Sequence, residues 1–80
     1  MITIHFSALF DSEDRYHGEK VYTIAGIGHI LANVKSVVDD MRRLLVEKCT
    51  EWNLDPKVVT KIDIYYYDEI GEKIIFQWSK

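Results

Sequence analysis

The chain has 80 residues, of which 48% are hydrophobic and 29% are charged, and its formal net charge is −3. These values are typical of a small globular protein, and we interpret residues 1–80 as a single domain. One cysteine excludes a disulfide scaffold and a cysteine-rich zinc site. No apolar run approaches the length of a membrane span, about 18 residues, and no secretory signal pattern opens the chain. We therefore expect a cytoplasmic protein that does not enter a membrane.

The first third of the chain has the pattern of two strands. Apolar residues occupy every second position over 2–10, which predicts a half-buried strand because side chains in a strand change face at every residue. We expect a polar loop over 11–18 and a second strand over 19–25. Pairing the two strands would place Tyr22 and Ile24 on the apolar face of the first.

From about Gly28 the apolar residues recur at steps of three and four. This spacing predicts one continuous amphipathic helix that ends near Asn53, because the residue before Pro56 is disfavoured in the helical region. A helix of about 25 residues is roughly 38 Å long, whereas a strand of about seven residues spans about 23 Å. We therefore expect parts of the apolar stripe, at Ile27 or at Leu44, Leu45 and Trp52, to overhang the sheet. Self-association would cover them, which predicts a homodimer.

The last third predicts a β-hairpin that turns over residues 68–72. Alternation indicates the pairs 62–78, 64–76 and 66–74, which would gather six apolar side chains on one face. The other face would then carry three pairs, namely Asp63 with Gln77, Tyr65 with Ile75, and Tyr67 with Lys73. The predicted fold is a two-layer α+β sandwich of order β-β-α-β-β. One long amphipathic helix packs on one face of a four-stranded, mainly antiparallel sheet.

Residues that could carry chemistry are scattered. The turn Gly26-Ile27-Gly28 resembles the start of a phosphate-binding loop but lacks its third glycine and its lysine, so whether it binds an anion stays open. The three histidines, His5, His17 and His29, lack the spacing of a transition-metal site. Cys49 lies late in the helix, where nothing lowers the pKa of a thiol, so we expect it to be inert. We expect no metal, no cofactor and no catalytic residue, and hence no enzyme.

The outer face of the sheet is the surface we expect to act. One helix cannot cover both faces, and the exposed face would carry tyrosine and aliphatic side chains with few charges, as protein interfaces do. The leading hypothesis is a non-catalytic protein-binding module that docks on a partner of unknown identity, in the manner of stoichiometric inhibitors of the phage-antagonist type. The expected contact residues are Tyr65, Tyr67 and Ile75 on the sheet and, as electrostatic guides in two loops, Asp11, Glu13, Asp14, Asp68 and Glu69.

Two alternatives belong to other classes. One is a protein that binds small anions or single-stranded nucleic acid through the tyrosines and the Gly26–Gly28 turn, although the net negative charge argues against nucleic acid. The other is an enzyme whose site is built across a dimer interface from His5, His17 or Asp63.

Overall fold

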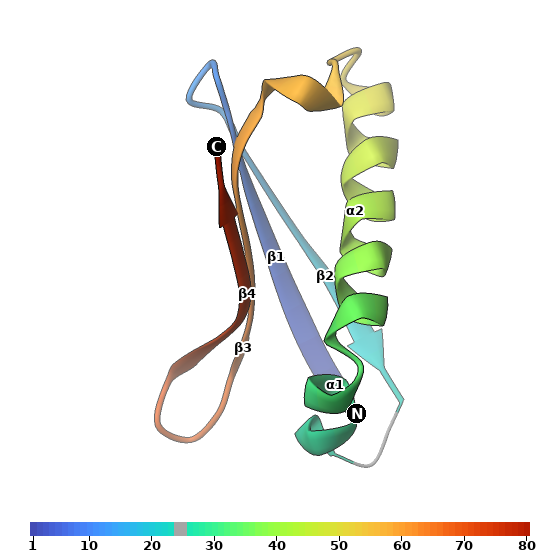
Figure 1. Cartoon of the computed structure of the whole chain (residues 1–80), viewed down its shortest axis with the longest axis vertical. Coiled ribbons are helices and arrows are strands. Elements are labelled where there is room, and N and C mark those ends of the chain that lie inside the picture. The colour runs from blue at the N-terminus through green and yellow to red at the C-terminus, as the bar shows by residue number, and fades with distance from the viewer. Residues whose placement is uncertain (24–25) are drawn as a thin grey trace.

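The structure is a computed structural model that describes residues 1–23 and 26–80. Its elements follow the expected β-β-α-β-β order, with the helical part in two segments and a short 3₁₀ turn before the third strand (Figure 1). The bounds of these elements in chain order are β1 Ile2–Phe10, β2 Arg15–Tyr22, α1 Ile27–Ala32, α2 Val34–Glu51, η1 Pro56–Val58, β3 Val59–Tyr67 and β4 Glu72–Ser79.

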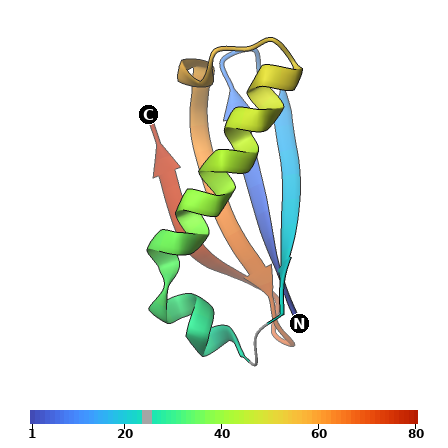
Figure 2. The ribbon, with the colours of Figure 1, turned by 90° about the vertical axis from the view of Figure 1, so that its right-hand side faces the viewer.

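The four strands form one sheet in the order β2-β1-β3-β4, and every neighbouring pair is antiparallel. The two predicted hairpins, β1–β2 and β3–β4, are therefore present. The first strand of each hairpin, β1 or β3, lies in the middle of the sheet, where the two pair with each other. Strands β2 and β4 are the edges. The predicted two-layer α+β fold is confirmed, since α2 packs along one face of this sheet (Figure 2).

The core lies between α2 and the face of the sheet that it covers. The apolar alternation of β1 supplies Ile4, Phe6, Ala8 and Phe10, as the sequence predicted. The other buried core residues come from β3 and from the helices, namely Val59, Ile64, Ile30, Val37, Val38, Met41, Leu45 and Cys49. Burial of these side chains is the main stabilising contribution to the fold.

The second strand starts four residues earlier than predicted. β2 begins at Arg15, so the polar loop shrinks to residues 11–14. Residues 15–18, which we expected in the loop, belong to β2 and pair with β1. Tyr16 lies opposite Ala8, and Gly18 lies opposite Phe6. Tyr22 pairs with Ile2 on the helix-facing side, as predicted, whereas Ile24 lies outside the described residues.

The predicted continuous helix is interrupted at Asn33. The backbone of this residue, at φ −128° and ψ 39°, leaves the helical region, and its side-chain amide donates a 2.8 Å hydrogen bond to the carbonyl of His29. Asparagine side chains compete with the backbone for such partners, which favours helix ends over helix interiors. The break sets α1 at an angle to α2, and Ile30 of α1 is only 2% exposed.

The predicted overhang of the helix is wrong for the same reason. α2 has 18 residues and is therefore roughly 27 Å long. β1 and β3 have nine residues each and span about 30 Å, so helix and sheet match in length. Of the residues expected to overhang, Leu45 is 5% exposed, whereas Trp52, just beyond the end of α2, is 42% exposed. No helix among the described residues is long and apolar enough to cross a bilayer.

The register of the last hairpin is correct in its outer half and wrong near the turn. The pairs Ile62–Trp78 and Ile64–Phe76 form as predicted, but Tyr65 then pairs with Ile74 and Tyr66 with Lys73. Ile75 is thus an extra residue on β4, a β-bulge that shifts all later pairs by one position. Alternation cannot reveal such an insertion, because the Ile74-Ile75-Phe76 run is apolar at every position.

Candidate functional site

The bulge changes which residues lie on the outer face. Directly paired residues share a face of an antiparallel sheet, so Ile74 accompanies Tyr65 on the outer face. Ile75, which we expected there, is partly buried and packs against the core on the helix side. Lys73 likewise lies beside Tyr66 and not beside Tyr67. Ile74 is therefore the outer-face residue that the sequence did not indicate.

Four aromatic side chains gather on the outer face, and we call them the aromatic cluster: His5, His17, Tyr65 and Tyr67. Three strands contribute to it, since His17 is on β2, His5 on β1 and both tyrosines on β3. The His5 ring stacks on Tyr65 at 5.4 Å between centroids and meets the edge of Tyr67 at 5.2 Å. His17 lies 6.0 Å from both His5 and Tyr65.

Tyr65 is the centre of this cluster and is itself buried. Its residual exposure is 7%, although it lies on a face that no described element covers. The neighbouring rings enclose it, and its hydroxyl lies 3.3 Å from Nε2 of His17. Burial and the neighbouring Tyr67 raise the pKa of the Tyr65 phenol. Replacing Tyr65 with glutamate would place a charge inside this packed cluster. Loss of binding in such a variant would therefore not distinguish a lost contact from a disturbed fold.

Tyr67 and Ile74 are the accessible members of this surface. Tyr67 is 58% exposed and Ile74 45% exposed. Val21 on the edge strand β2, at 51%, lies on the same face because it pairs with Thr3. Large exposed hydrophobic side chains on one uncovered face of a sheet are the feature that the interface hypothesis requires.

The two acidic loops are not brought together. Asp11, Glu13 and Asp14 form the β1–β2 turn, and Asp68 and Glu69 belong to the β3–β4 turn. Because β1 and β3 are antiparallel, these turns lie at opposite ends of the sheet (Figure 1). All five residues are exposed. Only Asp68 and Glu69 lie at the same end of the sheet as Tyr67. The five acidic residues therefore form two separate groups and not one continuous acidic surface.

The outer face carries charges of both signs. Arg15 and Lys61 lie on it, and so do three acids, Glu19, Asp63 and Glu72. Lys61 Nζ lies 3.8 Å from an Asp63 oxygen, and Gln77 donates a 3.1 Å hydrogen bond to the same carboxylate. A surface for phosphates needs a continuous basic stripe. The aromatic rings could stack on bases, but the charges around them do not favour a nucleic acid.

His5, His17 and Asp63, the residues named for an enzyme, all lie on the outer face. His17, Ser7 and Asp63 lie in one row across β2, β1 and β3, with Ser7 in the middle. In a Ser-His-Asp triad the imidazole lies between the hydroxyl and the carboxylate. Among residues 1–23 and 26–80, no group of three histidine, cysteine, aspartate or glutamate side chains is arranged to hold a metal ion.

The Gly26–Gly28 turn joins an extended residue to a short helix. The helix it precedes, α1, has only six residues. Gly26 is extended, at φ −176°, and a Cβ on either glycine would meet nothing within 4 Å. Neither position therefore requires glycine for packing within the protein.

Cys49 is fully buried in the core, although its position beside the apolar stripe predicted only partial burial. Burial, with a smaller contribution from Asp55, raises the pKa of its thiol. A thiol of this kind is a poor nucleophile because the thiolate is the reactive form.

Comparison of the chain with protein-family models, with curated proteins and with solved structures gives no match to any of them.

Proposed function

We propose that the protein is a non-catalytic binding module that docks on a partner protein through the outer face of its sheet. The observation that supports this most is the aromatic cluster with its exposed neighbours: Tyr67 and Ile74 present large apolar surfaces around a buried Tyr65. Tyrosine is enriched in interfaces because it offers a large contact area with few rotatable bonds. In this proposal the protein acts in the cytoplasm, by occupying its partner's surface.

The aromatic cluster is preorganised for such contacts. Its rings already pack against one another in the free protein, with Tyr67 edge-on to Tyr65 at 5.7 Å. Side chains held in place lose little conformational freedom on binding, and that loss is a main cost of association. The exposed Asp68 and Glu69 adjoin Tyr67 and supply a negative rim, which favours a partner with basic residues beside its apolar contact.

The proposal is tested by capturing partner proteins from a cell lysate with the wild-type protein and with matched variants. Tyr67→Glu and Ile74→Glu each add a charge to the outer face at an exposed position. The control is Val46→Glu, which makes the same kind of change at a residue 49% exposed on α2, in the other layer. We expect the wild type and Val46→Glu to retain one partner near one-to-one, and both outer-face variants to lose it.

A photo-crosslinking amino acid at position 67, with the same group at position 46 as control, locates the contact. Crosslinks to the captured partner from position 67 alone agree with the proposal. A partner retained by all variants, or crosslinked from position 46 instead, contradicts the outer face as the binding surface. Recovery of a nucleic acid in place of a protein would favour the alternative function.

A second copy of the chain is one candidate partner. The length of α2 gives no reason to expect self-association, because helix and sheet match in length. The edge strands β2 and β4 do offer surfaces for a second copy, and β4 carries Ile74 and Trp78, which are 45% and 40% exposed. Light scattering at micromolar concentration distinguishes the mass of the chain, 9.4 kDa, from twice that value. A monomer would contradict the homodimer that we propose here, without bearing on a different protein partner.

A further inference from the structure

A groove opens on the helix side of the sheet, beside the C-terminal end of β4, which α2 does not cover. α2 crosses the sheet obliquely, so the C-terminal end of β4 lies beside it and not beneath it (Figure 2). The groove has a volume of about 510 Å³. Four elements line it: α2 through Arg42 and Leu45, η1 through Pro56 and Lys57, β3 through Val59 and Ile62, and the end of β4 with the following residue through Trp78 and Lys80.

The floor of the groove is apolar. Ile62 and Trp78 are a directly paired couple on the helix-facing side of β3 and β4, and Leu45 faces them from α2. Trp78 is 40% exposed, which leaves much of a large aromatic side chain in contact with solvent. Apolar area of this kind is released from water when a ligand covers it.

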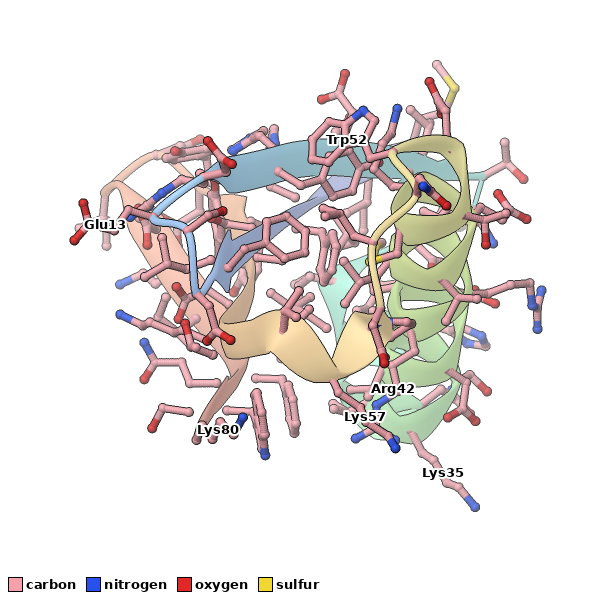
Figure 3. The ribbon with its side chains drawn as sticks, turned by 90° about the horizontal axis from the view of Figure 1, so that it is seen from above. Glu13, Lys35, Arg42, Trp52, Lys57 and Lys80 are labelled. Atoms are coloured by element: carbon pink, nitrogen blue, oxygen red, sulfur yellow. The ribbon has the colours of Figure 1, made fainter. Side chains whose placement is uncertain are left out.

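Three cations surround this floor. Arg42, Lys57 and Lys80 all line the groove, and no acidic residue does so. They are three of the ten lysine and arginine residues of a chain whose net charge is −3. Figure 3 shows their side chains on one side of the molecule, where they come from the middle of α2, from η1 and from the chain end. The gathering is therefore local and opposite in sign to the protein as a whole.

Among residues 1–23 and 26–80, the three groove cations take part in none of the ion pairs within 4.0 Å. The carboxylates in those pairs lie beside His5, Lys20, Arg43, Lys48 and Lys61. Lys80 is held beside η1 and β3: its Nζ donates a 3.5 Å hydrogen bond to the backbone carbonyl of Lys57, and its amide donates a 2.9 Å hydrogen bond to the carbonyl of Thr60. Asp55 caps η1 by accepting from the Lys57 amide at 2.9 Å.

We propose that this groove binds a small organic carboxylate with an apolar body. The apolar part would lie on Trp78, Ile62 and Leu45, and the carboxylate would face the guanidinium and the two ammonium groups. Small-molecule sites measure about 300–1,000 Å³ and combine an apolar lining with a few placed polar groups. The groove fits that description in volume and lining.

The tryptophans provide a direct measurement. The chain has two, and Trp52 lies at the far side of the helix end, packed edge-on against Phe10 and Tyr16. In a Trp52→Phe background, Trp78 is the single fluorophore and belongs to the groove. Titration with decanoate, below its micelle concentration, should give a saturable one-to-one change in Trp78 emission. Decanol and decyltrimethylammonium should give none, since they lack the negative charge.

Charge-reversal variants identify the site. Arg42→Glu and Lys57→Glu change exposed residues and should each weaken decanoate binding about tenfold, the effect of losing one hydrogen bond to a charged group. The control is Lys35→Glu, the same reversal at an exposed position of α2 outside the groove (Figure 3). It should change the affinity less than about twofold, the residual effect of net charge in a screening solvent.

Three results would overturn the proposal. One is no saturable change in Trp78 emission up to millimolar decanoate. Another is equal weakening by Lys35→Glu, which would indicate a response to net charge alone. The third is binding of an acidic, leucine-containing peptide by the groove when decanoate fails to bind. Because none of these variants touches the outer face, failure here leaves the proposed binding module untested and unchanged, and the two proposals fail independently.

Discussion

The hydroxyl of Tyr22 on β2 donates a 2.9 Å hydrogen bond to Oδ2 of Asp40 on α2. Lys20 Nζ reaches the same oxygen at 2.9 Å, so one carboxylate fastens the edge strand to the helix at two points. The hydrogen bond from Lys20, followed by that from Tyr22, keeps the pKa of Asp40 below its usual value against the opposing effect of burial. Burial and the bond to Asp40 raise the pKa of Tyr22.

Asp40→Asn should therefore destabilise the protein in a pH-dependent way. A carboxylate whose pKa is lowered by folding stabilises the fold above its unfolded pKa, about 4, and loses that contribution as the pH falls through the folded pKa. We expect a loss of about 1 kcal/mol at pH 7, modest because Lys20 is partly exposed. Urea unfolding of both proteins at pH 7 and pH 3 measures it. A difference that grows toward pH 3 would contradict this role.

Gly18 is required by the ring that lies over it. A Cβ at this position would lie 2.6 Å from the Tyr16 hydroxyl and 2.9 Å from Cζ, and Tyr16 is held against Phe6 and Trp52. Gly18→Ala should cost about 1–3 kcal/mol as an overpacked site, despite the better strand propensity of alanine. Thermal unfolding of the single and double variants with Tyr16→Ala forms a mutant cycle. The cost at position 18 should disappear once the ring is removed.

Gly71 is required for a different reason, its backbone conformation. It has φ +140° in the β3–β4 turn, and a Cβ there would contact nothing within 4 Å. Gly71→Ala should destabilise by about 1–3 kcal/mol through backbone strain alone. Gly28→Ala, at a position with equal space and no such φ, is the matched control and should be neutral or slightly stabilising. Equal unfolding midpoints for the two variants would refute the distinction.

Cys49 should react only when the protein unfolds. It is fully buried, and burial raises the pKa of its thiol. We expect an aromatic disulfide reagent to modify it at least about a hundredfold more slowly in the native protein than in denaturant, because access requires opening of the core. Absorbance of the released thiolate follows the reaction. Rapid modification under native conditions would show that the α2 end opens readily.

The sequence determined the number and order of the strands, the helical region and the face that β1 buries. Alternation over 2–10 places Ile4, Phe6 and Phe10 in the core without further information, because a strand reverses its side chains at every residue. The uncovered outer face also follows from the sequence, since one helix covers one side of a sheet. Tyr65 and Tyr67 lie on that face as predicted.

Tertiary structure decided the features that alternation does not encode. A bulge within an all-apolar run exchanges Ile75 for Ile74 on the outer face, and the enclosing rings bury Tyr65. Asn33 ends one helix and begins another because its side chain finds a carbonyl partner. The groove depends on tertiary structure most of all. Arg42, Lys57 and Lys80 are far apart in the chain, and only the oblique crossing of α2 over the sheet brings their charges around one apolar floor.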